Sequence, residues 1–431
     1  MITNYESEVF GRNYWSYSLE APLHIPSLSL PSSADVVIVG AGITGLFAGM
    51  LLSRKGLNVI CLDAGTIAGL ASSTNGGILT LGYKQSSGDL VKRLGIEVTV
   101  DLYRMALQSY DLVERTIAEE KIECNFSSKG HVELASKLTH YSAMQENAEF
   151  IEKHINHRYE HICKSDVSQY IGSTKYHGAT LDRQAKSMHP LKFMHGVALA
   201  ARRYGVHLHE HVEVKRIHRL SGKYTLETSK GIITAPNIIL ATNAYLGDLF
   251  PWLQQRTVAV GSQIIATKKL SSSLCKSLME ESFTASDTLR MLSYFRLSPD
   301  GKRLLFGGRR PLMAFSPQRQ FMTTYRSMLE TYPQLKGVSI DYAWSGNVCM
   351  TRDHMPLIGQ IDGLYFAIGY NGGGMGLGAF LGTKVAESLL GHKDELPYLR
   401  DRIVKRFPAY LGRHGTKLIG YAYYRLIDIF A

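Results

Sequence analysis

Asp35-Val36-Val37-Ile38-Val39-Gly40-Ala41-Gly42-Ile43-Thr44-Gly45 is a short apolar run that leads directly into a G-x-G-x-x-G turn. The pattern predicts a buried strand, a tight turn and the start of a helix. Gly40 permits the turn, Gly42 lets the backbone approach a pyrophosphate, and Gly45 lets the helix pack closely on the strand. Because a helix N-terminus offers free N–H groups to phosphates, the stretch predicts a dinucleotide site.

The residues that follow support this prediction. Residues 46–55 have the composition of a helix that Gly56 ends, and residues 58–62 predict a second strand that closes on Asp63. An acid about 20 residues beyond such glycines is where a ribose-binding carboxylate is expected. The βαβ unit is therefore complete, which argues against an ordinary solvated glycine turn.

Composition limits the class of protein. The chain has 431 residues, enough for about three domains or for two interleaved ones. Its 45% hydrophobic and 20% charged residues are typical of a soluble globular protein. The net charge is +11, but the basic residues are scattered and form no nucleic-acid motif, so we expect no nucleic-acid partner.

The cysteines and the first residues bear on location. The five cysteines are far apart and form no C-x-x-C pair, which favours reduced thiols and a cytoplasmic protein. Residues 1–20 carry acids and aromatics rather than a basic start and an apolar stretch, so no secretory signal is predicted.

Three alternating histidines, His207, His209 and His211, are the nearest approach to a metal site. On a strand they would share one face, as metal ligands sometimes do. No second cluster supplies further ligands, so we predict no metal and expect a partly exposed strand at the edge of the nucleotide-binding domain.

The order of elements predicts two kinds of sheet. Helical spacing covers 88–121, 138–159 and 191–204, and strands are expected at 124–135 and 206–210. An antiparallel meander at 211–217, 223–228 and 231–235 precedes a buried strand at 237–244. A second, more antiparallel sheet is predicted from 257–267, 289–298 and 302–307, and another buried strand from 363–370.

Two further loops offer backbone donors. The small-residue loop Gly69–Gly77 is suited to lie against a phosphate or a flat ring. The glycine turn Asn371–Gly376 opens a late helix that extends through Leu390, and it is a second place where backbone N–H groups can meet a cofactor.

The order of these motifs resembles the FAD-dependent D-amino-acid oxidase superfamily, which includes glycine oxidase, sarcosine oxidase and D-amino-acid dehydrogenase. Six matches carry the resemblance in order: the glycine turn with Asp63, Gly69–Gly77, Met188-His189-Pro190, Ile239–Ala244, Asp300–Gly308, and Thr351–Gly359 leading to Gly369–Gly374. The opening Asn13-Tyr14-Trp15 is most similar to the gamma-glutamylputrescine oxidoreductase branch.

The resemblance implies a fold. It is α/β, or α+β over the whole chain: a Rossmann-type FAD-binding domain with an interleaved substrate domain built on a mainly antiparallel sheet. The expected FAD-binding domain is discontinuous and comprises 1–87, 165–250 and 340–431, and the substrate domain comprises 88–164 and 251–339.

The resemblance also implies FAD, bound non-covalently in extended form. It implies that Gly40, Gly42 and Gly45 contact the pyrophosphate and Asp63 the adenosine ribose. The inner phosphate or the flavin side would meet Ser72, Ser73, Thr74, Asn75, Gly76 and Gly77, and the adenine would meet the backbone of Val214. The flavin ring would lie against Gly372, Gly373, Gly374 and Met375, and the other expected cofactor residues are Ile43, Thr44, Ala64, Ala241 and Thr242. Asp63 stands where the superfamily usually has Glu, and Thr74 where it often has Arg.

A third departure bears on the substrate. Amino-acid oxidases of this type often place an arginine three residues before the Thr-x-Asp turn, where a guanidinium grips the substrate carboxylate. This chain has Val348 there, which favours an amine substrate unless Arg296, Arg309 or Arg352 substitutes. Cys349 does not match the offset of the thiol that binds flavin covalently in sarcosine oxidases.

The implied reaction is oxidation of a C–N bond of an amine such as gamma-glutamylputrescine: a hydride passes from the α carbon to flavin N5, and water hydrolyses the resulting imine. No catalytic acid or base is identified, and His189 is expected to be structural. Tyr83, Tyr294 and Tyr370 are expected to line the substrate pocket, with Arg296 as a further candidate.

Three alternatives remain open. One is a D-amino-acid or glycine oxidase or dehydrogenase. Another is a flavin dehydrogenase at the inner face of the membrane that passes electrons to quinone, with the basic and aromatic segment 410–431 on anionic lipid. The third is a flavin-binding scaffold without activity. The sequence leaves open whether O₂ or another acceptor reoxidises the flavin.

Overall fold

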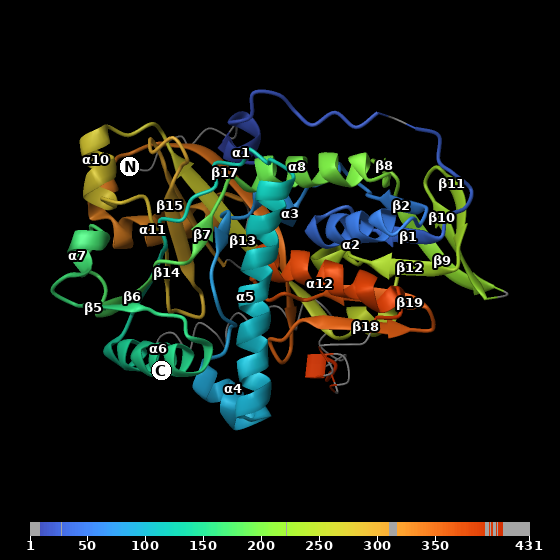
Figure 1. The fold of residues 1–431 in the computed structure, drawn as a ribbon. Coiled ribbons are helices and arrows are strands. Elements are labelled where there is room, and N and C mark those ends of the chain that lie inside the picture. Colours follow the sequence, from blue (N-terminus) through green and yellow to red (C-terminus); the bar gives the residue numbers. More distant parts are fainter. Residues whose placement is uncertain are drawn as a thin grey trace.

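The computed structural model describes residues 9–26, 28–220, 222–309, 317–392, 396, 398–399, 402 and 404–407. These residues form two large sheets with helices around them, which confirms the mixed α/β class. In Figure 1 the six-stranded sheet and its helices lie on the right, the eight-stranded sheet lies on the left, and the long helix α5 (Ile96–Glu119) runs between them.

The six-stranded sheet is the predicted nucleotide-binding unit. Its strands are parallel except for β18, which is antiparallel to β19. The spatial order is β18 (Leu357–Ile361), β19 (Leu364–Ile368), β12 (Asn237–Leu240), β1 (Val36–Val39), β2 (Val59–Leu62) and β8 (His207–His209).

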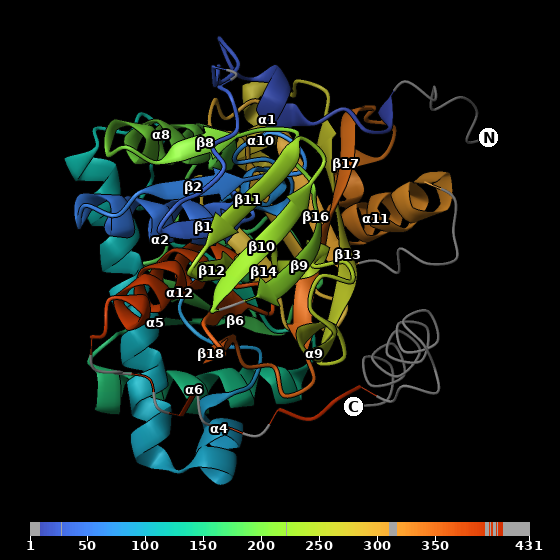
Figure 2. The ribbon, with the colours of Figure 1, turned by 90° about the vertical axis from the view of Figure 1, so that its right-hand side faces the viewer.

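The central strands of this sheet are buried on both faces, as their continuous apolar sequences predict. Val36 and Ile38 pack in the same cluster as the helices on one face, whereas Val37 and Val39 pack with the antiparallel meander on the other. Figure 2 looks onto that meander. The helices are α2 (Ile43–Arg54), α8 (Pro190–Arg203) and α12 (Gly374–Leu389); the meander is β9 (Val214–Leu220), β10 (Lys223–Thr228) and β11 (Gly231–Ala235).

The histidine strand lies at the edge of this sheet, as expected. On β8, His207 is exposed and His209 is buried, and His211 follows in a left-handed conformation with φ of 55°. No group of three metal-ligating side chains occurs within the described ranges.

The eight-stranded sheet is antiparallel except where β14 runs parallel to β4. Its order is β17 (Ile340–Thr351), β13 (Thr257–Thr267), β16 (Leu304–Arg309), β15 (Ser293–Leu297), β14 (Thr284–Asp287), β4 (His131–Leu134), β6 (Gly178–Asp182) and β5 (Glu160–Cys163). One face carries Ile265, Phe295 and Phe306, which pack with α10 (Ser272–Leu278), α11 (Pro317–Thr331) and η3 (Pro333–Leu335).

The remaining elements connect and cover the two sheets. Of the expected strand at 124–135, only β4 forms. The covering helices α4 (Ser87–Leu94), α5 and α6 (Leu138–Ile155) confirm the predicted helical stretches. The short elements are α1 (Tyr14–Tyr17), α3 (Ala71–Thr74), β3 (Ile78–Leu79), α7 (Val167–Tyr170), β7 (Lys186–Ser187), η2 (Asn243–Tyr245) and α9 (Pro251–Gln254).

Strand pairing bears on the domain boundaries. The ranges expected for the FAD-binding domain include β6 and β17, but both strands belong to the eight-stranded sheet. The division into two interleaved domains remains a proposal, and the sheets favour assigning these two strands to the substrate domain.

Candidate active site

A cavity of about 1170 Å³ extends from the carboxyl edge of the six-stranded sheet to one face of the eight-stranded sheet. Ligand pockets usually have volumes of about 300–1000 Å³, so this cavity has room for a large ligand and a smaller one beside it.

The glycine turn forms one end of the cavity. Gly40 has φ of +104°, and a Cβ on it would lie 2.9 Å from the carbonyl carbon and oxygen of Ala241. A Cβ on Gly42 would lie 2.8 Å from Ser72 Oγ, and one on Gly45 would overlap the carbonyl oxygen of Gly40. Each glycine therefore permits a close approach that a side chain would prevent.

Asp63 is fixed beside this turn at the end of β2. Its Oδ2 accepts a hydrogen bond from the Ala41 N–H at 3.0 Å, and its Oδ1 accepts one from the Gly65 N–H at 2.8 Å. Burial raises the pKa of Asp63, and the two N–H donors partly oppose that shift. The carboxylate lines the cavity and has lone pairs left for a ribose hydroxyl.

Most of the predicted cofactor residues line the cavity: Gly40, Gly42, Ile43, Thr44, Asp63, Ala64, Ser72, Thr74, Asn75, Gly76, Val214, Ala241, Thr242, Gly372, Gly373, Gly374 and Met375. Gly45, Ser73 and Gly77 do not. Gly45 packs on the strand, Ser73 is buried, and Gly77 is pressed against the Met188 carbonyl.

Thr242 gives a direct sign of a missing polar partner. Its Oγ1 is buried at the cavity wall and has no hydrogen-bond partner among the described residues. Buried hydroxyls are normally paired, so this atom fits a contact with a bound group. Together with the glycine turn and Asp63, it shows that the residues present suit an extended dinucleotide.

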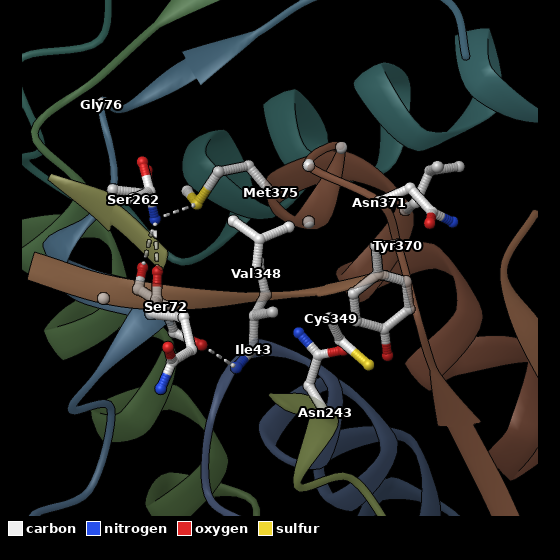
Figure 3. A pocket seen from close by; sticks show the side chains of 18 of the residues that line it. Ile43, Ser72, Gly76, Asn243, Ser262, Val348, Cys349, Tyr370, Asn371 and Met375 are labelled. Carbon is white, nitrogen blue, oxygen red and sulfur yellow. Dashed lines mark hydrogen bonds between the residues drawn. The ribbon is translucent and has the colours of Figure 1, made fainter. Parts of the chain in front are cut away.

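Asn75 joins the two loops predicted to hold the flavin ring. Its Nδ2 donates to Met375 Sδ at 3.2 Å and to the carbonyls of Ala71 and Ser72 at 2.9 Å. In the view of Figure 3, Val348 lies between Met375 and Ile43. The loops come from α3 and α12, which are 300 residues apart along the chain.

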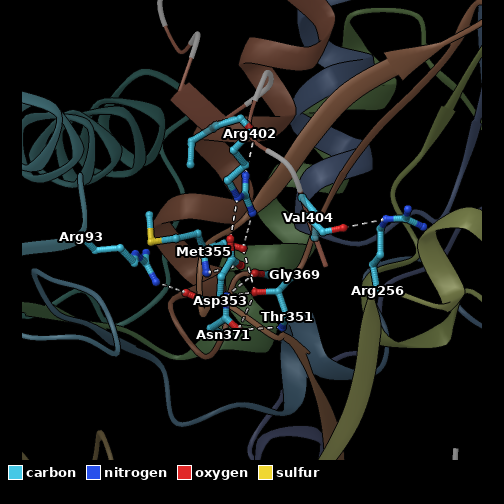
Figure 4. Close-up of polar contacts among 10 residues, drawn as sticks. Arg93, Arg256, Thr351, Asp353, Met355, Gly369, Asn371, Arg402 and Val404 are labelled. Carbon is cyan, nitrogen blue, oxygen red and sulfur yellow. Dashed lines mark hydrogen bonds and ion pairs between the residues drawn. The ribbon is translucent and has the colours of Figure 1, made fainter. Parts of the chain in front are cut away.

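A polar network holds the second glycine turn in place. Asn371 Oδ1 accepts from the Thr351 N–H at 2.9 Å, and Asp353 accepts from Arg402 Nε at 2.8 Å (Figure 4). Burial opposes ionisation of Asp353, but the bond and charge of Arg402 lower its pKa below the ordinary value. The turn before Gly372 is therefore tied to the end of β17.

The three predicted tyrosines all line the cavity. Tyr294 lies against Gly76, and its hydroxyl is 2.9 Å from Ser262 Oγ. The Tyr83 hydroxyl donates to the Leu102 carbonyl, and that of Tyr370 donates to the Ala367 carbonyl and is 2.6 Å from Thr44 Oγ1. These two phenols are therefore held by the protein, and each presents its ring rather than a free hydroxyl.

Arg296 does not belong to the pocket, which corrects its selection as a pocket candidate. It is 6% exposed, and it donates from Nη1 to the carbonyls of Gly77 and Met188 and from Nε to that of Leu297. Its charge is satisfied by backbone oxygens, so it is a structural residue that joins β15 to the cofactor loop.

Arg352 and Arg309 are the other arginines that could bind a substrate carboxylate. Arg352 is exposed and donates to the Arg406 carbonyl, outside the cavity lining. The side chain of Arg309 lies outside what the structure describes. Val348 and Cys349 line the cavity, and burial raises the pKa of the Cys349 thiol to about 12.

Sequence reasoning missed a polar group of residues at the far end of the cavity. Lys84, Glu133, Asp182 and Arg290 line it there, and Arg290 is the single arginine among the described lining residues. A signal was present in His131-Val132-Glu133-Leu134, because two titratable residues that alternate with apolar ones lie on one face of a strand.

Comparison with known proteins identifies the family. Residues 35–388 match the family model described as FAD dependent oxidoreductase, and the chain belongs to that family. The resemblance inferred from the motifs is thereby confirmed.

Two relatives are similar over nearly their whole length. The chain is 31% identical to gamma-glutamylputrescine oxidoreductase of Escherichia coli, over 96% of this chain and 98% of the relative. It is also 31% identical to a probable oxidoreductase, OrdL, of Haemophilus influenzae, over 99% of both.

A solved structure shares the fold. Glycine oxidase from Geobacillus kaustophilus superposes with a TM-score of 0.73 at 20% sequence identity, covering 88% of this chain and all of that one. This likeness confirms the expected fold class.

The predicted membrane contact concerns the helices and the segment 410–431. None of the helices in the described ranges is long and apolar enough to span a bilayer. The segment 410–431, on which the predicted contact with anionic lipid depended, lies outside the described residues.

Proposed function

We propose that this FAD-dependent oxidoreductase oxidises the C–N bond of an amine, in the class of gamma-glutamylputrescine. The observation that carries the proposal is Val348, an apolar side chain in the cavity wall at the position where related amino-acid oxidases carry a carboxylate-binding arginine. The similarity to the enzyme named for gamma-glutamylputrescine supports the same substrate class.

When bound, FAD supplies a two-electron acceptor at flavin N5. The amine loses a hydride and a proton to become an imine, and water converts the imine to an aldehyde and ammonia. The glycine turn and Asp63 would hold the dinucleotide, and the loops joined by Asn75 and Met375 would hold the ring.

The chain's own contribution to the reaction is to position a neutral amine and exclude water. Val348, Tyr294 and Ile264 give the cavity apolar and aromatic surface beside the ring-binding loops. Such surface favours the neutral amine over the ammonium ion and orients its α carbon. No catalytic acid or base is assigned.

We propose that FAD is held without a covalent bond. Cys349 is the thiol nearest the ring-binding turn in sequence, but it is 1% exposed and its raised pKa keeps it protonated at neutral pH. A protonated, buried thiol is a poor nucleophile. We further propose a cytoplasmic enzyme that uses O₂ or another acceptor.

A second candidate is oxidation of a D-amino acid or glycine. Arg290 favours it, because this guanidinium lines the cavity from the loop that joins β14 and β15. A carboxylate bound there would orient the substrate by its acid group rather than by its amine.

Steady-state kinetics with an artificial electron acceptor tests the proposal. We expect the highest kcat/KM with gamma-glutamylputrescine, lower values with putrescine, and little turnover with D-alanine, glycine or sarcosine. Preference for D-alanine or glycine, with release of an oxo acid, would contradict the amine assignment and support the role of Arg290. Oxygen consumption in the same assay shows whether O₂ is the acceptor.

A further inference from the structure

The cavity continues beyond the cofactor loops into a second compartment between α5, α6 and the eight-stranded sheet. We call it the distal chamber and define it by lining residues whose side chains are aromatic or polar: Tyr103, Glu133, Asn147, Tyr159, Thr180 and Asp182. Neither the dinucleotide nor the reacting amine accounts for these side chains.

Strand register places the chamber at a definite distance from the ring-binding loops. Tyr294, which lies against Gly76, pairs with Ser286; Ser286 pairs with Glu133; and Glu133 pairs with Thr180. Paired residues project from the same face of a sheet, and all four line the cavity. Adjacent strands are about 4.8 Å apart, so Glu133 is about 10 Å from Tyr294 across the sheet.

Glu133 is an acid whose carboxylate accepts no hydrogen bond from the described residues. Its side chain lines the cavity. Burial raises its pKa, and the charge of Lys84 lowers it in part. A buried carboxylate in this state gains most from a cation that enters the cavity.

Asp182 gives a second, independent sign. It is 4% exposed and lines the same chamber. Its Oδ1 accepts from the N–H groups of Gln184 and Ala185 and is 3.0 Å from His157 Nε2. Its Oδ2 is buried and has no hydrogen-bond partner in the part of the chain that the structure describes. One acceptor is thus structural, and the other is available to a donor.

The chamber also has an aromatic wall suited to a cation. Burial, and the nearby negative charges of Glu133 and Asp182, raise the pKa of Tyr159, and burial and Glu133 raise that of Tyr103. Both phenols therefore stay neutral. Neutral aromatic rings beside carboxylates are the usual surroundings of a bound ammonium group.

We propose that the distal chamber binds an ammonium group at the far end of an elongated amine substrate, with Glu133 and Asp182 as its acceptors. This inference rests on the proposed amine oxidation and narrows its substrate class to amines with a second, remote cationic group. An extended chain covers about 1.2 Å per bond, so about 10 Å corresponds to roughly eight bonds between the reacting carbon and the distant nitrogen.

Chain length and charge can be varied separately in the test. The series H₂N–(CH₂)ₙ–NH₂, with n from four to ten, is compared with n-alkylamines of the same length. We expect kcat/KM for the diamines to be highest near n of eight. We expect the ratio of diamine to alkylamine kcat/KM to fall about 10- to 100-fold in Glu133→Gln.

The second variant is Asp182→Asn. It keeps Oδ1 as acceptor for the Gln184 and Ala185 N–H groups and replaces Oδ2, the oxygen without a hydrogen-bond partner among the described residues, by an amide nitrogen. We expect the same ratio to fall in this variant. Glu149→Gln serves as the matched control. Glu149 is exposed on α6, a helix that covers the chamber, so this change should leave the ratio unchanged.

The outcomes separate the two proposals. An active wild type whose diamine-to-alkylamine ratio is the same in Glu133→Gln and in Asp182→Asn would overturn the chamber assignment while leaving amine oxidation intact. Equal losses with both kinds of amine would mean that the carboxylates act on structure alone, and would also overturn it. Absence of turnover with every amine would refute the proposed function itself.

Discussion

The two ends of the cavity are built in different ways. At the nucleotide end, glycines bring the backbone close to the ligand: Gly40 passes under Ala241, and Gly42 packs against Ser72. At the distal end, side chains such as Glu133 and Asp182 project from strands that are far apart in sequence. The comparison teaches that backbone shape builds the proposed cofactor end, whereas strand register builds the proposed substrate end.

The largest expected effect comes from breaking the link between the two ends. Arg296→Gln removes the donors to the Gly77 and Met188 carbonyls and leaves these acceptors buried. We expect a loss of about 4 kcal/mol in the free energy of unfolding. The Met188 carbonyl loses its charged donor, and the Gly77 carbonyl, which keeps the Met188 N–H, and the Leu297 carbonyl each lose a bond from the guanidinium, at roughly 1–3 kcal/mol each. Chemical denaturation measures it. A raised KM with unchanged stability would instead indicate that Arg296 contacts the substrate.

The next effect tests the close backbone packing at the nucleotide end alone. In Gly45→Ala the new Cβ overlaps the Gly40 carbonyl oxygen, and we expect a loss of about 3 kcal/mol. The matched control is Gly88→Ala, also within a helix, where the nearest atom to a Cβ is 3.9 Å away. The control should be neutral or stabilising. Equal thermal stability of the two variants would contradict the packing account.

A smaller effect tests the cofactor contact made by a side chain at the same end. Asp63→Asn turns an amide N–H₂ toward the Ala41 or Gly65 N–H and removes a charged acceptor. We expect FAD to bind about 10- to 100-fold more weakly. Fluorescence titration of the flavin-free protein with FAD measures the Kd, with Asp35→Asn, at the amino end of β1, as the control. An unchanged Kd for FAD would show that Asp63 does not bind the ribose.

The smallest effect is a dependence of stability on pH. Burial, with the charges of Lys192 and Arg296, lowers the pKa of His189 to about 3, below the ordinary 6.5. The unfolded chain therefore binds more protons between pH 3 and 6.5, so His189 costs stability as the pH falls through that range. The loss reaches about 2 kcal/mol at pH 5.

The variant His189→Asn keeps an acceptor for the Lys192 N–H at the start of α8 but has no titrating group. Unfolding measured at pH 7 and at pH 5 should therefore differ less in this variant than in the wild type. The same pH dependence in both proteins would show that other groups, such as the buried His131, account for it.

The sequence predicted which residues line the nucleotide end of the cavity, and the reason is physical. Gly40, Asp63 and the strands around them lie within one continuous βαβ unit, so local spacing defines the geometry. Tyr294 and Glu133, by contrast, become neighbours only through pairing of β15, β14 and β4. Burial of Arg296 by carbonyls 108 and 219 residues away along the chain is equally invisible in local sequence, which is why its place outside the cavity lining was not predicted.

The most direct test is the visible spectrum of the purified protein under anaerobic conditions, before and after addition of gamma-glutamylputrescine. The account predicts the absorbance of a bound flavin, its bleaching by this amine, and release of free FAD on acid denaturation. Absence of flavin, or a flavin bleached by D-alanine and not by the amine, would contradict it.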